Sequence, residues 1–221
     1  MDATTFDLTP TQAVAQQRAL REQIRLRPLP HPPTLIGGTD ISFNLYSNHF
    51  YAAVVVLDYR TLEVLETASA EMDVDFPYVP GLLSFREIPA LLAAWKKLAR
   101  KPDVVMVDGH GIAHPRRMGI ATHFGLVTQV PTLGCAKKVL VGSHPEPGPE
   151  KGAATALTHQ GEQVGYALRS KDRVKPVFIS PGHLLDLEGA LAVARHCCAK
   201  HKLPEPTRQA HLAVNSLRRK K

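Results

Sequence analysis

The segment that most constrains the fold is VVMV at residues 104–107, a short and continuously apolar run that ends in an acid, Asp108. A strand without polar alternation is typical of a central parallel strand that helices cover on both faces. A helical pattern, SFREIPALLAAWKKLAR, precedes it at 84–100, and another apolar run, PTLGCA, follows at 131–136 after a segment of helical character. Because strand, helix, strand order gives right-handed parallel crossovers, the middle of the chain predicts an α/β sheet.

Strands that pair differently are expected before this unit. The β-rich runs at 34–43, 50–59 and 62–74 are joined by connections so short that antiparallel hairpins are favoured. The predicted fold class is therefore α/β, with a mixed central sheet, an antiparallel meander plus parallel strands, flanked by helices. The other expected elements are a helix over 9–28 with Thr9 as N-cap and Pro28 as stop, a polar loop at 142–152, strands at 162–170 and 176–180, and helices starting near Asp186 and over 205–217.

Composition narrows the class of partner. The 221 residues suit one domain spanning 1–221, which ends in a short basic tail, RRKK, at 218–221. Lys and Arg outnumber Asp and Glu by 27 to 20, and the net charge of +7 favours a polyanionic partner, although a basic protein without one would show the same balance. Three cysteines do not make a disulfide framework, and neither a leader pattern nor an apolar run of membrane-spanning length is found. We expect a cytoplasmic protein that does not bind membranes.

Three acids stand out once these elements are placed. Asp40 lies inside the first predicted strand, Asp108 ends the central one, and Glu87 lies in the first turn of the helix between them. If the two strands are neighbours, Asp40 and Asp108 converge, and converging carboxylates repel unless a cation lies between them. Mg²⁺ or Mn²⁺, held by one or two carboxylates and by phosphate oxygens, fits that need. Glu87 is equally explained as the capping-box partner of Ser84.

Five segments of the chain resemble the endonuclease V family, the metal-dependent nucleases that recognise deaminated adenine in nucleic acid. They occur in the family's order between about residues 35 and 211: GGTDISF, PYVPGLLSFREIPALLAAW, PDVVMVDGHGIAHPRRMGIATHFG, PTLGCAKKVL and LPEPTRQAH. The family's fold is of the ribonuclease H type, which agrees with the mixed sheet predicted above. The chain is expected to form a single endonuclease V domain, and we expect a monomer because nothing in the pattern demands a dimer.

The resemblance implies a role for each acid and for two basic side chains. Asp40 and Asp108 match the family's metal-binding aspartates, and Glu87 matches its third active-site acid. Lys137 matches a lysine near the cleaved phosphate, and Lys138 could share that role. His211 matches a position that binds the metal through water or transfers a proton.

The segment PYVPG implies how the damaged base is recognised. In the family this loop is similar to a wedge that parts the strands, and Tyr78 would stack between bases; a packed turn is the alternative for an aromatic residue flanked by prolines. His114, Arg116 and Arg117 are expected to hold phosphates. The predicted substrate-binding residues are Tyr78, Val79, Pro80, Gly81, Leu82, Gly109, Gly111, His114, Arg116 and Lys138.

The resulting hypothesis is a Mg²⁺-dependent DNA repair endonuclease that recognises deoxyinosine. It would hydrolyse the second phosphodiester bond 3′ to the lesion and leave 3′-hydroxyl and 5′-phosphate ends. Two alternatives stay open, an endoribonuclease of the same fold that acts on inosine-containing or structured RNA, and a non-catalytic nucleic-acid-binding protein. A zinc site at HGIAH is disfavoured, because Gly111 stands where the general base of that motif would be.

Overall fold

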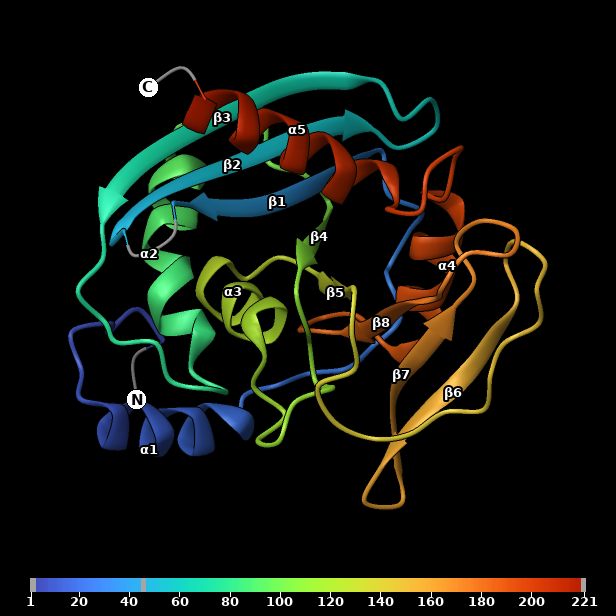
Figure 1. The fold of residues 1–221 in the computed structure, drawn as a ribbon, viewed down its shortest axis with the longest axis horizontal. Helices are drawn as coiled ribbons and strands as arrows, with labels where there is room; N and C mark the ends of the chain where they lie inside the picture. The colour runs from blue at the N-terminus through green and yellow to red at the C-terminus, as the bar shows by residue number, and fades with distance from the viewer. Residues whose placement is uncertain (1–2, 45–46, 220–221) are drawn as a thin grey trace.

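The structure, a computed structural model, describes residues 3–44 and 47–219 and is built around one mixed sheet (Figure 1). Within this part of the chain the strands are β1 (Leu35–Phe43), β2 (His49–Asp58), β3 (Val64–Asp73), β4 (Val104–Asp108), β5 (Thr132–Ala136), β6 (Ala154–His159), β7 (Glu162–Leu168) and β8 (Val177–Pro181). The helices are α1 (Pro10–Arg21), α2 (Leu83–Lys96), α3 (Ile120–Thr128), α4 (Leu187–His196) and α5 (Glu205–Arg219).

The sheet joins its strands in the order β3-β2-β1-β4-β5-β8-β7-β6. β1, β2 and β3 form the expected antiparallel meander, and β4 and β5 extend it as parallel strands, so the predicted fold class is confirmed. Beyond β5 the sheet turns antiparallel again through β8, β7 and β6, which the sequence does not indicate. The sequence also misses β6, because this edge strand buries only Leu157 and therefore lacks an apolar pattern.

β4 is buried on both faces, as its composition predicts. Val105 and Val107 point into a core shared with α2 and α3, whereas Val104 and Met106 point into a second core shared with α4 and α5. Two pairs of helices therefore cover opposite faces of the sheet (Figure 1). Loss of a large buried side chain from such a position costs about 2–5 kcal/mol of stability. This packing makes β4 a rigid support for Asp108 at its end.

The N-terminal helix begins as predicted and ends earlier. Thr9 caps α1, and its side chain and that of Gln12 complete a capping box. The predicted stop at Pro28 is wrong, because α1 ends well before it. The backbone N–H of Arg25 donates instead to Nδ1 of His183, 3.3 Å away, and this long-range bond draws the chain out of the helix.

The predicted capping box of α2 is wrong. The helix begins at Leu83 without a side-chain cap, so Ser84 lies inside its first turn. The hydroxyl of Ser84 instead bonds Nδ1 of His123 on α3, at 3.1 Å. Capping therefore does not explain Glu87, and its position must have another reason.

The basic tail is described in part. Arg218 and Arg219 belong to α5, and Lys220 and Lys221 lie outside the described residues. Nη1 of Arg218 donates to the carbonyl of Phe43 at 3.2 Å, so the first tail residue also fastens α5 to the end of β1.

The cysteines are free and buried, which agrees with the absence of a disulfide framework. No helix in the described ranges has the length and hydrophobicity needed to cross a bilayer.

Candidate active site

The parallel pairing of β1 with β4 places Asp40 and Asp108 side by side on neighbouring strands. The parallel register places Thr39 beside Val107, so the next residues, Asp40 and Asp108, follow at the same height. Side chains alternate along a strand. Both acids therefore continue the rows that face α5, in line with Ile36 on β1 and the even-numbered residues of β4. The expectation that these strands are neighbours is confirmed.

Gly38 lets α5 approach the acids. A Cβ atom at this position would lie 2.0 Å from the carbonyl oxygen of Pro206, so only glycine permits α5 to pack this closely on β1. The helix then carries His211 to the site, where Nδ1 lies 2.7 Å from Oδ2 of Asp40. Oδ1 of the same carboxylate accepts from the backbone N–H of Ile41 at 2.8 Å. The histidine is thus held against a fixed carboxylate.

Lys137 lies against the second acid. It follows β5, the parallel neighbour of β4, and its Nζ is 2.7 Å from Oδ2 of Asp108. Burial lowers the pKa of Lys137, but the neighbouring acids, Asp108 first and then Asp40, act against it, and the pKa lies above its usual value. The ammonium group therefore stays charged at the site.

Burial and the charges of neighbouring acids raise the pKa values of Asp40 and Glu87. The pKa of Asp40 rises to about 6, first because the group is buried and then because Asp108 is close, against the hydrogen bond from His211. The pKa of Glu87 rises to about 8 through burial, then through Asp40 and Asp108. Glu87 therefore lies in the field of both strand acids, and the structure brings together the five residues that the family resemblance indicates.

A divalent cation fits these carboxylates. Mg²⁺ prefers one or two carboxylates together with water and substrate phosphate over a closed protein cage. No three His, Cys, Asp or Glu side chains in the described ranges form a ready-made ligand set. Burial and the nearby Asp108 disfavour the ionisation of Asp40, and a cation between the two side chains would offset this, so Asp40 and Asp108 could hold it.

HGIAH does not provide a zinc site. His110 and His114 lie in the loop between β4 and α3, where no helix presents them on one face. His114 is used structurally: its Nε2 lies 3.0 Å from the carbonyl oxygen of Gly81, and its Nδ1 accepts from the backbone N–H of Arg116 at 3.2 Å.

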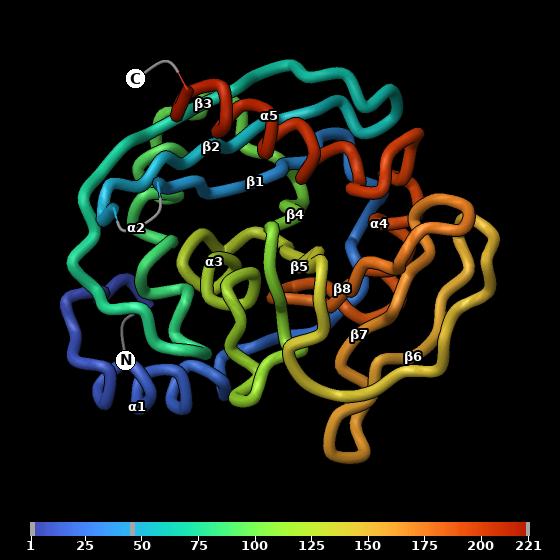
Figure 2. The backbone as a smooth tube through the Cα atoms, in the orientation of Figure 1, coloured from blue at the N-terminus to red at the C-terminus, as the bar shows by residue number. Residues whose placement is uncertain are grey.

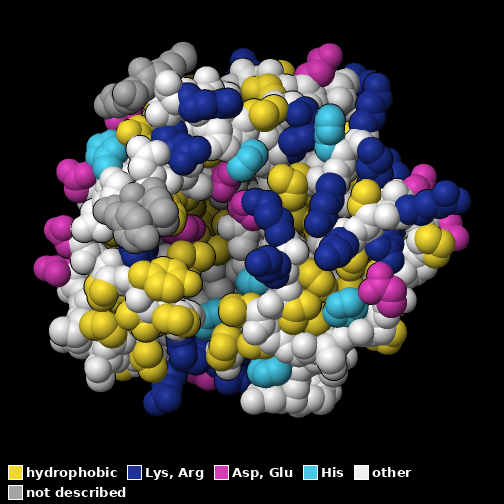
Figure 3. Space-filling view, in the orientation of Figure 1, with side chains coloured by type: hydrophobic (Ala, Val, Ile, Leu, Met, Phe, Trp, Pro, Cys, Tyr) yellow, Lys and Arg dark blue, Asp and Glu magenta, His cyan; other side chains and the backbone are white. Residues whose placement is uncertain are grey.

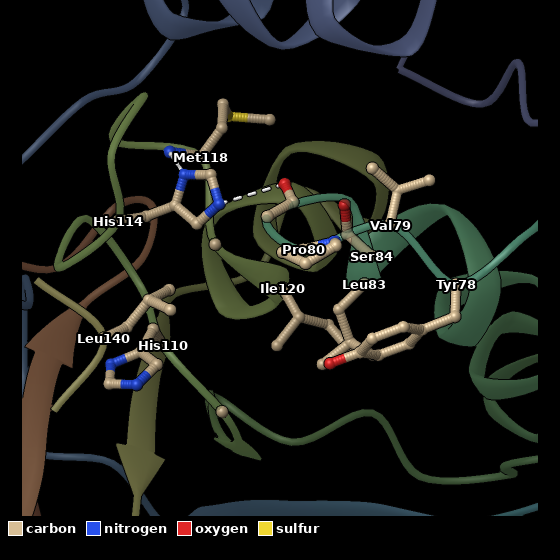
Figure 4. A pocket seen from close by; sticks show the side chains of 13 residues that line it. Tyr78, Val79, Pro80, Leu83, Ser84, His110, His114, Met118, Ile120 and Leu140 are labelled. Carbon is tan, nitrogen blue, oxygen red and sulfur yellow. Dashed lines mark hydrogen bonds between the residues drawn. The ribbon is translucent and has the colours of Figure 1, made fainter. Parts of the chain in front are cut away.

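A cavity of about 200 Å³ opens beside the acids, between the loop before α2 and the loop after β4 (Figure 4). Gly109 lines it and directly follows Asp108, so the cavity and the acid cluster adjoin. The predicted binding residues that line it are Tyr78, Val79, Pro80, Gly81, Gly109 and His114. The residues that line it but were not predicted are Leu83, Ser84, His110, Met118, Gly119, Ile120 and Leu140.

Four predicted binding residues lie outside this lining: Leu82, Gly111, Arg116 and Lys138. Leu82 is buried in the core under α2. Gly111 packs against β8, where a Cβ atom would lie 2.0 Å from the carbonyl oxygen of Pro181, so its close approach is to protein backbone. Gly109 and Gly111 cannot be told apart by sequence pattern. In the structure Gly109 lines the cavity, whereas Gly111 packs against β8.

Tyr78 is 72% exposed at the mouth of the cavity, so the packed-turn alternative does not describe it (Figure 4). On the face that Figure 3 shows, acidic side chains lie in a hollow between a hydrophobic patch and a group of basic side chains. Such a surface suits a nucleic acid whose bases and phosphates are bound on opposite sides.

The three predicted phosphate ligands are largely engaged within the protein. Arg116 donates from Nη2 to the carbonyl of Gly81 at 2.9 Å. Arg117 is buried and pairs with Glu162 at 2.8 Å, which removes it from the hollow. Lys138, by contrast, is exposed.

His110, which the sequence suggested only as part of the zinc motif HGIAH, lines the cavity. Its Nδ1 is buried and has no hydrogen-bond partner among the described residues, and burial lowers the pKa of the ring to about 4. The imidazole is therefore neutral, and one of its two nitrogens is without a partner in the described part of the chain. The position of His110 between Gly109 and Gly111, directly after Asp108, is the sequence feature that could have indicated a cavity residue.

Carboxylates on two neighbouring parallel strands, one inside β1 and one at the end of β4, in a sheet of this order, define a ribonuclease H-like nuclease. Comparison with known proteins identifies the family within that class. The family model described as Endonuclease V matches residues 18–212. The chain belongs to the endonuclease V family, and it is a hydrolase of phosphodiester bonds, so the non-catalytic alternative no longer stands.

Individual relatives cover nearly the whole chain. The endonuclease V of Myxococcus xanthus is 49% identical, over 99% of this chain and 93% of that protein. The crystal structure of endonuclease V from Streptomyces avermitilis has a TM-score of 0.92 at 40% identity and covers 97% of this chain and 95% of its own. Endonuclease V of Ciona intestinalis, in complex with a 24mer DNA containing an inosine followed by a ribo-adenosine, has a TM-score of 0.82 at 25% identity, covering 95% and 98%.

Proposed function

We propose that this nuclease is a Mg²⁺-dependent repair enzyme that cuts DNA at deoxyinosine. It hydrolyses the second phosphodiester bond 3′ to the lesion and leaves 3′-hydroxyl and 5′-phosphate ends. The observation that carries the proposal is the junction of cavity and acids, because Gly109 lines the cavity and Asp108 precedes it on a rigid strand. The Ciona intestinalis relative, which binds inosine-containing DNA, supports the choice of base.

The cavity suits a single base turned out of its strand. Its volume of about 200 Å³ is below the roughly 300–1,000 Å³ of pockets for drug-sized ligands. Tyr78 at the mouth can stack in the place of the extruded base, which is worth about 1–3 kcal/mol. A deaminated base pairs weakly and therefore costs less to extrude, which favours the lesion over adenine.

The acids and their partners act on the phosphate. Asp40 and Asp108 would hold Mg²⁺, which supplies positive charge at the phosphoryl oxygens and lowers the pKa of the attacking water. Lys137 keeps its charge beside Asp108 and can stabilise negative charge that develops on the phosphate. His211 holds a proton between Nδ1 and Asp40. Glu87, with a pKa of about 8, can take up or release a proton near neutral pH.

The test is cleavage of an end-labelled DNA strand with one deoxyinosine, beside the same strand with adenine, in Mg²⁺ and then in EDTA. We expect one Mg²⁺-dependent cut, one nucleotide beyond the lesion, in the first strand alone. A matched RNA strand with one inosine separates the alternative substrate. Preferential cutting of the RNA would replace DNA by RNA in the proposal, and equal cutting of all strands would refute base recognition.

A further inference from the structure

Gln17 on α1 lies behind the cavity and is completely buried. Burying an amide group costs free energy unless its polar atoms form hydrogen bonds. Both polar atoms of the Gln17 side chain are hydrogen-bonded. Nε2 donates to the carbonyl of Gly81 at 3.0 Å and to that of Met118 at 3.2 Å. Oε1 accepts from Nε of Arg116 at 2.5 Å. Figure 2 shows α1 passing beneath the loops that carry these partners.

The two carbonyls belong to two different loops that line the cavity. Gly81 stands in the loop before α2, and Met118 stands in the loop between β4 and α3. One NH₂ group therefore bridges the two loops, and its two hydrogens fix their separation. Arg116 strengthens the bridge, because it bonds both Gln17 and Gly81.

The carbonyl of Gly81 is saturated. Three donors reach it, Nε2 of Gln17, Nε2 of His114 at 3.0 Å and Nη2 of Arg116 at 2.9 Å (the bond from His114 is dashed in Figure 4). A carbonyl oxygen has two lone pairs, so three donors use its full capacity as an acceptor. Rotation of this peptide unit would break all three hydrogen bonds at once.

That peptide unit belongs to the turn that forms one wall. The N–H of Leu82 donates to the carbonyl of Val79 at 2.9 Å, and Gly81 has a φ of +79°. Proline followed by a glycine of positive φ is the pattern of a type II turn, here with Pro80 and Gly81 at its centre. Tyr78 stands directly before the turn, so the orientation of the turn also sets where the exposed ring lies.

We propose that Gln17 is a positioning residue that fixes the width of the cavity and thereby sets the preference for inosine over adenine. The inference rests on the proposed function, because it takes the cavity as the place of the extruded base. His114 and Arg116 share one loop, whereas Gln17 comes from a separate helix and ties that loop to the turn. Without Gln17 the bonds from His114 and Arg116 to Gly81 remain, but the bond that ties Met118 to the same bridge is lost. The separation of loop and turn is then less closely fixed, and a base of another shape can enter.

The test compares Gln17→Leu, which is similar in size and makes none of these bonds, with Gln16→Leu. Gln16 is buried on the same helix and is not among the donors to Gly81. A third variant, Gln17→Glu, keeps an acceptor for Arg116 but turns a carboxylate oxygen toward the two carbonyls. For each protein, amide hydrogen exchange at Leu82 and the affinities for inosine and adenine strands are measured in Ca²⁺.

We expect Gln17→Leu and Gln17→Glu to exchange faster at Leu82 and to bind the inosine strand about tenfold more weakly, the change that about 1.4 kcal/mol gives. The affinity for the adenine strand falls less, so the ratio of the two affinities drops. Gln16→Leu keeps the wild-type ratio.

Unchanged exchange in Gln17→Leu would overturn the proposal, as would an equal loss of ratio in Gln16→Leu or a wild-type ratio in Gln17→Glu. Wild-type protein without inosine preference would instead refute the proposed function. In that case exchange at Leu82 still decides whether Gln17 fixes the turn.

Discussion

Gly38→Ala should disable the active site without touching an acid. The new Cβ atom would lie 2.0 Å from the carbonyl oxygen of Pro206, whereas non-bonded atoms settle at about 3.5 Å. α5 must therefore move by about 1.5 Å by that contact distance. His211, five residues further along the same helix, then leaves its 2.7 Å contact with Asp40.

The loss can be sized from this displacement. Overpacking of this kind costs about 1–3 kcal/mol of stability, and misplacing a catalytic group by 1 Å costs about a hundredfold in rate. Urea unfolding and single-turnover cleavage measure the two effects separately.

Gly37→Ala is the matched control. Its new Cβ would meet side-chain atoms of Pro102 at 2.9 Å and Val105 at 3.2 Å, away from α5. We expect a cleavage rate within about threefold of wild type, since no group of the site is displaced. Equal rates for the two alanine variants would refute the argument that Gly38 positions α5.

The remaining predictions concern binding and acid stability. Tyr78→Ala should weaken binding of inosine DNA by about 1–3 kcal/mol, measured by fluorescence anisotropy, and unchanged affinity would contradict the wedge. Burial lowers the pKa of His123 to about 4. As the pH falls below about 6.5, His123 therefore takes up a proton in the unfolded chain before it does so in the folded one. The free energy of unfolding should not depend on the titration of this residue above that pH, and it should fall by about 1.4 kcal/mol per pH unit between about pH 6.5 and pH 4. Urea unfolding at pH 7 and pH 5 checks this, and the same slope in His123→Asn would rule it out. Deletion of 218–221 should weaken DNA binding and lower its salt dependence by about 0.9 in log–log slope for each phosphate that the tail neutralises, while the preference for the lesion stays. Disappearance of that preference in the truncated protein would refute this separation of roles.

Local pattern and strand order were enough to predict the centre of the site. An apolar strand that ends in Asp108, placed after a short meander, is permitted to pair with the strand that carries Asp40, and the register confirms that it does. The roles of Lys137 and His211 came from family resemblance alone, because their approach depends on how β5 and α5 cross the sheet.

What the sequence could not predict depends on contacts between distant segments. Ser84 has the spacing of a cap, yet its hydroxyl bonds His123, thirty-nine residues away. Gly111 looks like a ligand-facing glycine, yet β8 lies against it. Gln17 is one polar residue among several on α1, and only the folded chain brings it to Gly81. In each case a contact between distant segments decides between two interpretations that the local sequence pattern supports equally well.

The central claim is that the cavity selects the base and the adjoining acids cut the strand. Single-turnover cleavage of paired strands that differ only in inosine or adenine, with Mg²⁺, tests it most directly in wild type and in Asp108→Asn. The account predicts fast cutting of the inosine strand alone by wild type, and loss of cutting with retained inosine binding in Asp108→Asn. Undiminished cutting by Asp108→Asn, or equal rates on both strands, would contradict it.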